Sequence, residues 1–356
     1  MSYWEKITIL IHTKDRPWFL LRLIKYYNEK LSSVGINVMI LDGSSDENFA
    51  IISEELSRKK YKLRPRVLHH SPSASLVHRV VEALELISTP YVLLAANDDI
   101  YFFDWLKSAV ELLDSDDTYG VVYGHAISFE LEQFTPYGKL FKADVIKPNP
   151  PARWLEGDTP LDRLTELGKS NWTTIGWYAL QRTELLSVIA RSAEDYEFNV
   201  RHFELFFVFC QTALSKTKML DEIYLARQKC VDAKYRTLSF KEDEEAFKKI
   251  MNVSVSILSQ HKNIEMKSAI SMVENAFRAE LDQLKQNDSR KYFRIIADYF
   301  PVLRELKSHF NSFMMKKGFK FDPLLSDERF PATPNISFDH PKVKELVDIV
   351  ANVDSV

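Results

Sequence analysis

Short apolar segments alternate with helical patterns along the first 125 residues, and this alternation limits the fold more than any other feature. The apolar segments lie at residues 7–11, 37–41, 66–69, 91–95 and 119–123, and helical patterns fill the intervals between them. The first is β-branched in character and, like the fourth, reads as a strand buried on both faces, whereas 66–69 is a weaker strand. Strands that alternate with helices are typical of an open α/β sheet with parallel strands. The sequence therefore predicts an α/β nucleotide-type sheet at the N-terminal end.

Glycine and proline divide the chain in two. Eight of the nine glycines lie between Gly35 and Gly176, and neither glycine nor proline occurs from Trp177 to Phe300. Such a stretch favours helices, because these two residues mark most breaks and turns. We expect helices at 203–214, 241–260, 264–286, 289–316 and 342–350, and a C-terminal helical domain over residues 236–356 after a first domain of residues 1–235. Five prolines between residues 130 and 160 predict a loop-rich insert there, and residues 172–180 read as extended.

Charge and cysteine content narrow the functional classes. With 47 Lys and Arg against 50 Asp and Glu, the net charge is −3, so we expect no nucleic-acid partner. The two cysteines have no C-x-x-C spacing and read as buried thiols of a reducing compartment. The sequence has neither an apolar run of membrane-spanning length nor an apolar leader at its start. A cytoplasmic location is the expectation.

Polar clusters follow three of the predicted strands, and they define one candidate site. Ligands of open α/β sheets bind beyond the carboxyl ends of the strands. At these ends the sequence carries Thr13 to Arg16, Asp42 to Ser44, and Asn97-Asp98-Asp99. Although these clusters are far apart in the chain, a parallel sheet brings them to one edge.

Each cluster has a possible ligand-binding role and also a simpler structural explanation. The adjacent carboxylates Asp98 and Asp99 suit a hard divalent cation that also binds a diphosphate, although a solvated turn is the plainer explanation. Asp42 can accept hydrogen bonds from a base or ribose, or it can form a turn with Gly43. Arg16 and Arg79 suit phosphate, or they are surface arginines. No glycine-rich phosphate loop or G-x-S-x-G is present.

Four segments, in this order, resemble inverting GT-A glycosyltransferases of the family-2 type. The segment ITILIHTKDRPWFLLRLI resembles the first motif of that family, and VMILDGSSDEN resembles the second. STPYVLLAANDDIYFFDWL is similar to the strand that leads into the D-x-D element, and HFELFFVFCQTALSKTKMLDEIYLARQ is similar to the acceptor-side helix and the following loop. The resemblance covers residues 5 to 230 and implies a GT-A fold, a Rossmann-like open sheet, with a C-terminal α-helical extension.

The resemblance also implies roles for individual residues. Asp99 would be the metal ligand for Mg²⁺ or Mn²⁺, and Glu204 the catalytic base. The donor nucleotide would be held by a set of residues from several loops: Thr13, Arg16, Asp42, Arg79, Asn97, Asp98 and Arg227. Asn97 departs from the family, which more often has Asp there, and Glu204 stands where many relatives have Asp. Residues 124–180 would form the insert and acceptor region.

The implied partners are a nucleotide-sugar donor and a glycan or lipid-linked acceptor, and the implied role is glycan or surface polysaccharide synthesis. Two other functions stay open: a sugar nucleotidyltransferase, and a GT-A-like module that binds without catalysis. Residues 292–320 mix apolar and basic side chains. They predict either an ordinary packed helix, a homodimer contact or a helix lying on the inner face of a membrane.

Overall fold

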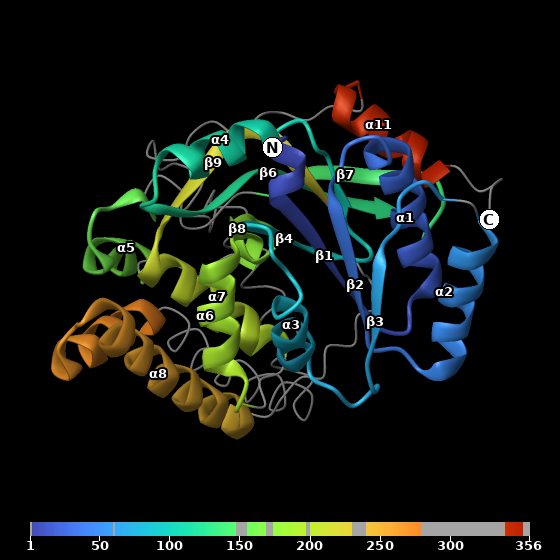
Figure 1. Cartoon of the computed structure of the whole chain (residues 1–356). Helices are drawn as coiled ribbons and strands as arrows, with labels where there is room; N and C mark the ends of the chain where they lie inside the picture. Colours follow the sequence, from blue (N-terminus) through green and yellow to red (C-terminus); the bar gives the residue numbers. More distant parts are fainter. Residues whose placement is uncertain are drawn as a thin grey trace, which may run out of the picture.

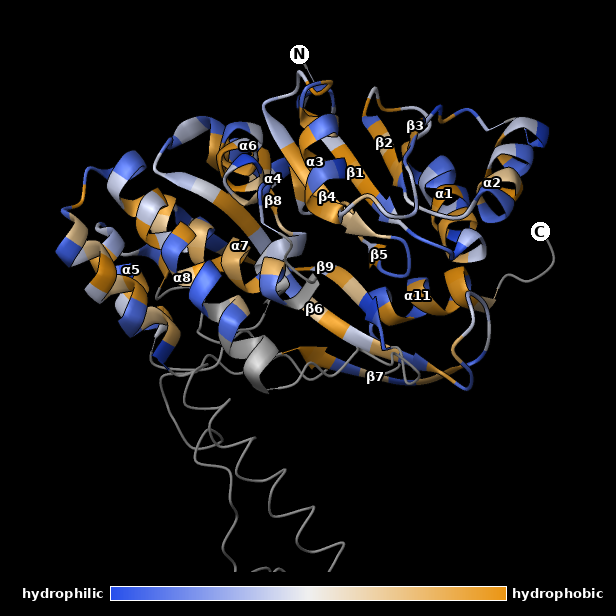
Figure 2. Ribbon diagram, turned by 90° about the horizontal axis from the view of Figure 1, so that it is seen from below, coloured by the Kyte–Doolittle hydropathy of each residue, from blue (hydrophilic) through white to orange (hydrophobic). Residues whose placement is uncertain are grey.

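A computed structural model describes residues 2–59, 61–146, 155–168, 174–196, 200–229, 240–278 and 339–351. In this part of the chain, one mixed sheet carries helices on both sides (Figure 1). Figure 2 shows hydrophobic residues along β2 and β6 and hydrophilic residues on the outer sides of α1 and α2. The predicted α/β class is confirmed.

The sheet has nine strands in these residues, in the order β3-β2-β1-β4-β8-β6-β9-β5, with β7 paired to β6. The neighbours β3, β2, β1 and β4 are parallel, as predicted, whereas β8 pairs antiparallel with both β4 and β6. The strands span Ile7–Thr13 (β1), Asn37–Asp42 (β2), Arg66–His69 (β3), Tyr91–Ala96 (β4), Ile100–Tyr101 (β5), Tyr119–Leu131 (β6), Leu140–Ile146 (β7), Leu180–Arg182 (β8) and Lys216–Gln228 (β9).

Helices follow most of the strands. They span Pro17–Leu31 (α1), Asp46–Arg58 (α2), Leu76–Leu84 (α3), Leu106–Ser115 (α4), Pro160–Leu167 (α5), Thr183–Ala193 (α6), Val200–Leu214 (α7), Phe240–Lys262 (α8) and Pro341–Ala351 (α11). Short 3-10 helices lie at Tyr3–Lys6 (η1) and Thr174–Tyr178 (η3), and residues 266–278 are also helical. Helices α3, α6, α7 and α8 pack one against the next. Figure 1 shows α8 outermost in this row.

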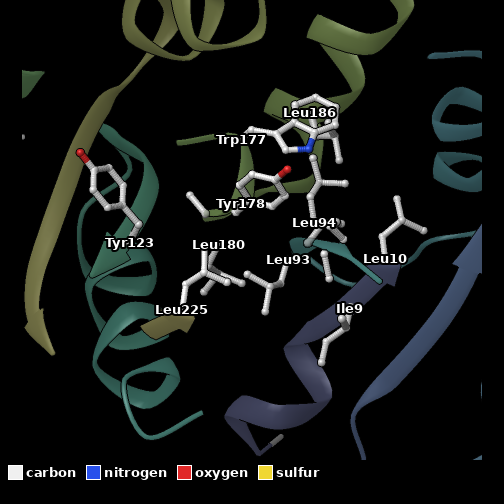
Figure 3. Close-up of a cluster of buried hydrophobic side chains, with 14 of the residues drawn as sticks. Ile9, Leu10, Leu93, Leu94, Tyr123, Trp177, Tyr178, Leu180, Leu186 and Leu225 are labelled. Carbon is white, nitrogen blue, oxygen red and sulfur yellow. The ribbon is translucent and has the colours of Figure 1, made fainter. Parts of the chain in front are cut away.

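The central core lies between β1, β4 and the helices of this row. Ile9 and Leu10 of β1 pair in register with Leu93 and Leu94 of β4, and all four are buried. Figure 3 shows these residues beside Trp177 from η3, together with side chains of β8, α6 and β9. Strands that are buried on both faces explain why their sequences are continuously apolar rather than alternating.

The polar residues before two helices predict a cap for each: Ser45 or Asp46 for α2, and Asp15 for α1. Ser45 caps α2, since its hydroxyl accepts a hydrogen bond from the Asn48 backbone N–H. Asp15 is not the cap of α1, because Arg16 occupies that position without a side-chain hydrogen bond. Asp15 instead has a left-handed backbone, with a φ of 53°, and its carboxylate bonds to the β2–α2 loop.

Two further expectations are corrected. The predicted irregular insert begins with a β-hairpin, because β6 continues to Leu131 and β7 pairs with it antiparallel. Pro136 lies in the hairpin turn, where it leaves the strand pairing intact. The segment expected to be extended before Leu180 contains η3, whose turn brings Trp177 and Tyr178 beside α7.

The C-terminal elements pack on the sheet domain at two separate places. Helix α8 contacts α7 and α6, and α11 contacts β7. Helix α11 confirms the predicted helix at 342–350. The predicted domain boundary at residue 235, the helix at 289–316 and the basic segment 292–320 lie outside the described residues.

Candidate active site

A cleft of about 1350 Å³ opens beyond the carboxyl ends of β1 and β4. All predicted site residues except Asp42 line it: Thr13, Arg16, Arg79, Asn97, Asp98, Asp99, Glu204 and Arg227. They come from six elements or loops that lie up to about 200 residues apart in the chain, so the topology of the sheet assembles the site.

Hydrogen bonds connect the β1–α1 loop to the β2–α2 loop and the start of α2. The Asp15 carboxylate accepts hydrogen bonds from the Ser45 backbone N–H at 2.9 Å and from the Asn48 side chain at 3.1 Å. These bonds, the Ser45 backbone N–H foremost, lower the pKa of Asp15. The Asp15 backbone N–H in turn donates to Ser44 Oγ at 2.8 Å. The β1–α1 loop, which carries Thr13 and Arg16, therefore has a fixed position against the β2–α2 loop.

Asp42 does not line the cleft. Its side chain is fully buried, and both carboxylate oxygens have partners. Oδ1 accepts a hydrogen bond from Ser44 Oγ at 2.6 Å, and Oδ2 is 2.7 Å from Nδ1 of His69. The His69 ring stacks on Phe49, with ring centroids 3.8 Å apart. Contact of Asp42 with a base or ribose stays a prediction.

Arg79 is a buried arginine that binds the backbone at the strand ends. Its Nη1 donates to the carbonyl oxygen of Thr13 at 3.0 Å and to that of Leu41 at 3.3 Å. Burial lowers its pKa, against the opposing effect of Asp42. A Cβ atom at Gly43 would lie 2.5 Å from this nitrogen, so a glycine at this position makes room for the guanidinium.

In the Asn97-Asp98-Asp99 segment, the first two side chains contact the β1–α1 loop and the third lies beside Arg227. Asn97 Nδ2 donates to Thr13 Oγ1 at 2.7 Å and to the Arg16 carbonyl oxygen at 3.4 Å. Asp98 forms an ion pair with Arg16, with Oδ2 and Nη1 2.6 Å apart. The Asn97 amide therefore holds the β1–α1 loop, a hydrogen-bond donation that the more usual aspartate at this position cannot make.

Asp99 is the most perturbed carboxyl group of the cleft. It is 2% exposed, and its Oδ2 accepts no hydrogen bond from any described residue, although Arg227 Nε lies 3.4 Å away. Burial raises its pKa to about 7 and outweighs the opposing effect of Arg227. An unsatisfied buried carboxylate oxygen suits a cation, and Mg²⁺ takes one or two carboxylates together with phosphate oxygens and water. In the described residues no three His, Cys, Asp or Glu side chains form a complete metal cluster, so phosphate and water would have to supply the remaining ligands.

Glu204, on α7, lines the same cleft. The neighbouring Phe203 and Phe207 are buried and pack edge-on against Trp177, with ring centroids 5.0 and 4.5 Å from it. These aromatic contacts explain why the polar position among them lines the cleft. Glu204 lines the cleft, and its role as the catalytic base stays a prediction.

Arg227 connects the two sides of the cleft. Its Nη2 donates to the Tyr178 hydroxyl at 3.2 Å, and its guanidinium lies 4.5 Å above the Tyr178 ring. Burial alone would lower the pKa of Arg227, but Tyr178, Asp99 and Glu204 together raise it, so the guanidinium stays charged. The arginine is thus a fixed cation between Asp99 and Glu204.

Several cleft residues were missed by the sequence analysis. His12 lines the cleft and directly precedes Thr13 at the end of β1. Its place at a strand end is the one sequence signal that marks it as a site residue. Tyr178, Asp144 and Lys229 also line the cleft, but no local pattern marks them. The fully buried Arg22 has a local signal, because it is a charged residue on the apolar side of α1.

The fold and the cleft point to an α/β protein of the nucleotide-sugar transferase type, and the comparison with family models agrees. The model of the family described as glycosyl transferase family 2 matches residues 8–189, just over half of the chain. The chain belongs to this family, and it has the GT-A fold. The activity that the family's description names is sugar transfer. No curated protein matched the chain in a separate sequence comparison.

Solved structures give weaker similarities. Crystal structures of S. aureus TarS include the 1–349 form with UDP-GlcNAc, which is 14% identical, with a TM-score of 0.48 over 78% of this chain and 72% of that one. For another TarS structure, at 15% identity and a TM-score of 0.47, the match covers 77% of this chain but 43% of that one. The mannosyltransferase PcManGT from Pyrobaculum calidifontis, in complex with GDP-Man and Mn²⁺, is 14% identical, with a TM-score of 0.42 over 89% and 88% of the two chains. In the described part of the chain, no helix has the length and apolarity needed to cross a membrane.

Proposed function

We propose that the protein moves a sugar from a nucleotide-sugar donor to an acceptor hydroxyl with inversion at the anomeric carbon. The observation that carries the proposal is that Glu204 and Asp99 line one cleft, with Arg227 beside both of them. This arrangement offers a base on one side and, on the other, a site for a leaving diphosphate.

In the proposed reaction, Glu204 accepts the proton of the acceptor hydroxyl. The acceptor oxygen forms a bond to the anomeric carbon while the bond from that carbon to the diphosphate oxygen breaks. Arg227, and Arg16 once released from Asp98, stabilise the charge that develops on the leaving diphosphate. A Mg²⁺ or Mn²⁺ ion held by Asp99, with Asp98 assisting, would supply further positive charge there.

The acceptor and the cellular role are finer proposals. The family membership suggests a glycan or lipid-linked acceptor and a role in surface polysaccharide synthesis. A cytoplasmic location, peripheral membrane contact and homodimerisation through the C-terminal helices rest on the sequence alone, since residues 292–320 lie outside the described residues.

Replacement of Glu204 by Gln tests the proposed base. We expect the Glu204→Gln variant to release nucleoside diphosphate from the donor at least about 100-fold more slowly, because the amide cannot take up the proton. Donor affinity should change little. The donor is first chosen from a panel of nucleotide sugars by thermal stabilisation of the protein. Initial rates of nucleoside diphosphate release, with acceptor or with water, then give the comparison.

Glu184→Gln is the matched control, since Glu184 is exposed on α6 and does not line the cleft. Wild-type rates in the Glu204→Gln variant would remove Glu204 from the mechanism. Donor binding without any turnover by the wild type would favour the non-catalytic module. Diphosphate release from a nucleoside triphosphate and a sugar phosphate would favour the nucleotidyltransferase.

A further inference from the structure

Arg22, in α1, is a buried cation whose hydrogen bonds reach three distant segments. Its side chain is 1% exposed. Nη1 donates to the Pro136 carbonyl oxygen at 2.6 Å and to Gln228 Oε1 at 2.9 Å, and Nη2 donates to the Asp98 carbonyl oxygen at 2.8 Å. One guanidinium therefore joins the β6–β7 turn, the end of β9 and the loop after β4.

Burial of the Arg22 guanidinium costs free energy because the charge loses its hydration. Its hydrogen bonds have to compensate this loss. Burial lowers the pKa of Arg22 to about 10, although Asp98 and Asp99 oppose this effect. The acceptors named above are neutral oxygens, which compensate a buried cation less than a carboxylate would. A well-packed apolar side chain at such a site is often as stable or more stable. The guanidinium must therefore contribute something other than core packing.

The acceptors of Arg22 belong to the segments that carry Asp99 and Arg227. Asp98 directly precedes Asp99 in the chain, and Gln228 directly follows Arg227. The backbone N–H of Gln228 also donates to the Asp99 carboxylate. Both polar atoms of the Gln228 side-chain amide are hydrogen-bonded. Oε1 accepts from Arg22, and Nε2 donates to the Thr135 carbonyl oxygen at 2.9 Å. Arg22 thus contacts the two segments whose side chains, Asp99 and Arg227, lie 3.4 Å apart in the cleft.

We propose that Arg22 is a positioning residue for the donor site, which sets the separation of Asp99 and Arg227 by holding the Asp98 carbonyl and the Gln228 side chain. The inference rests on the proposed function, in which Asp99 and Arg227 hold the donor diphosphate. Arg22 itself does not line the cleft and acts through these two neighbours.

Arg163 provides a matched control for the loss of a buried arginine. It is 3% exposed, and it binds the carbonyl oxygens of Thr212, Ala213 and Gly157 at 2.7, 3.0 and 2.7 Å. These bonds join α5 to the end of α7, and Arg163 does not line the donor cleft. Arg22→Met and Arg163→Met therefore remove similar sets of interactions, one near the donor site and one away from it.

The experiment compares wild type, Arg22→Met, Arg22→Lys and Arg163→Met. Hydrogen exchange of the ligand-free proteins is followed at residues 97–101 and 225–229. Affinity for UDP, GDP, CDP and ADP is measured with Mn²⁺ by calorimetry. We expect Arg22→Met to speed exchange at both segments and to weaken nucleoside diphosphate binding by about 10- to 100-fold. Arg22→Lys, which keeps the charge and is used if Arg22→Met does not fold, should recover part of this affinity.

The outcomes separate positioning from simple stabilisation. Arg163→Met should lower the melting temperature but leave the affinity and the exchange of both segments as in wild type. Equal melting temperatures and equal affinities for Arg22→Met and Arg163→Met, with unchanged exchange at residues 97–101 and 225–229, would overturn the proposal. If wild type binds none of the four nucleotides, the proposed function fails, and the exchange data still decide the role of Arg22.

Discussion

His12 lines the donor cleft at the end of β1, and its imidazole is held neutral. Its Nδ1 is buried without a hydrogen-bond partner among the described residues, and its ring packs edge-on against Trp177. Burial lowers its pKa to about 4, and the nearby Arg79 adds to this effect. At neutral pH the cleft therefore contains an uncharged imidazole among arginines.

This neutral state makes stability depend on pH in a defined direction. His12 takes up its proton near pH 6.5 in the unfolded chain but only near pH 4 in the folded protein. The contribution of neutral His12 to the free energy of unfolding is therefore fully present above pH 6.5. It is lost as the pH falls toward 4, by up to about 3 kcal/mol. Urea denaturation of wild type and His12→Gln between pH 4 and 7 measures the difference. We expect the variant to lose less stability on acidification.

His78→Gln is the control for this titration. His78 lies on α3 with a half-exposed side chain and does not line the cleft. Its replacement should leave the pH dependence near that of wild type. Parallel pH profiles for wild type and His12→Gln would show that His12 titrates alike in the folded and unfolded chains.

The sequence was informative about residues whose position follows from a strand end. Thr13, Asn97 and Asp99 were found because parallel strands bring their ends together. Tyr178 was missed because its partner Arg227 lies 49 residues away and leaves no local pattern. Arg22 was missed because its charge on the apolar side of α1 does not reveal its partners, of which Gln228 lies 206 residues away. Sequence reasoning also could not show that Asn97 holds the β1–α1 loop, since that contact depends on the packing of β1 beside β4.

Secondary structure was predictable where hydrophobic periodicity is strong. The strands β1 to β4 and the helices α1, α3 and α7 follow their apolar patterns. The β6–β7 hairpin was missed because its second strand is mostly half-buried and lacks a continuous apolar run. Its stability comes from pairing with β6 and from contact with α11, neither of which the local sequence reveals.

Helix α11 supports this hairpin from the outside. The Gly138 backbone N–H in the turn donates to the Val350 carbonyl oxygen at 2.9 Å. Glu345 forms an ion pair with Lys30 of α1 at 2.7 Å. Val343, Leu346 and Val350 are buried, so one apolar side of the helix is covered by the sheet domain.

Truncation of Leu346 tests the contribution of this helix. Leu346→Ala removes a fully buried side chain, and we expect it to lower the free energy of unfolding by about 2–4 kcal/mol. Hydrogen exchange should also become faster at residues 132–139, because the bond from Gly138 to α11 weakens. Denaturant titration and exchange measure the two effects. Lys344→Ala, at an exposed position of the same helix, should change neither, and equal effects of the two variants would contradict the assignment.

At the scale of the whole molecule, the packing of α8 on α7 predicts cooperative unfolding. Ile250, Val253 and Leu258 of α8 are buried, and α7 carries Glu204. All six tryptophans lie between Trp4 and Trp177, so none of them is in the C-terminal helices. Circular dichroism at 222 nm also reports α8. We expect the two thermal unfolding curves to coincide, as in a two-state transition. A separate helical transition would instead show an independent C-terminal domain.

The ion pairs of the cleft have a consequence for how a ligand reaches it. Arg16 is neutralised by Asp98, and Arg227 lies against Asp99, so the positive and negative groups largely cancel at a distance. A polyanion approaching such a surface meets a weak long-range field, and its association rate should depend little on ionic strength. Its charge is recognised only on contact, when the arginines exchange a carboxylate for a phosphate. Discrimination among anions would then come from their dissociation rates rather than from their association rates.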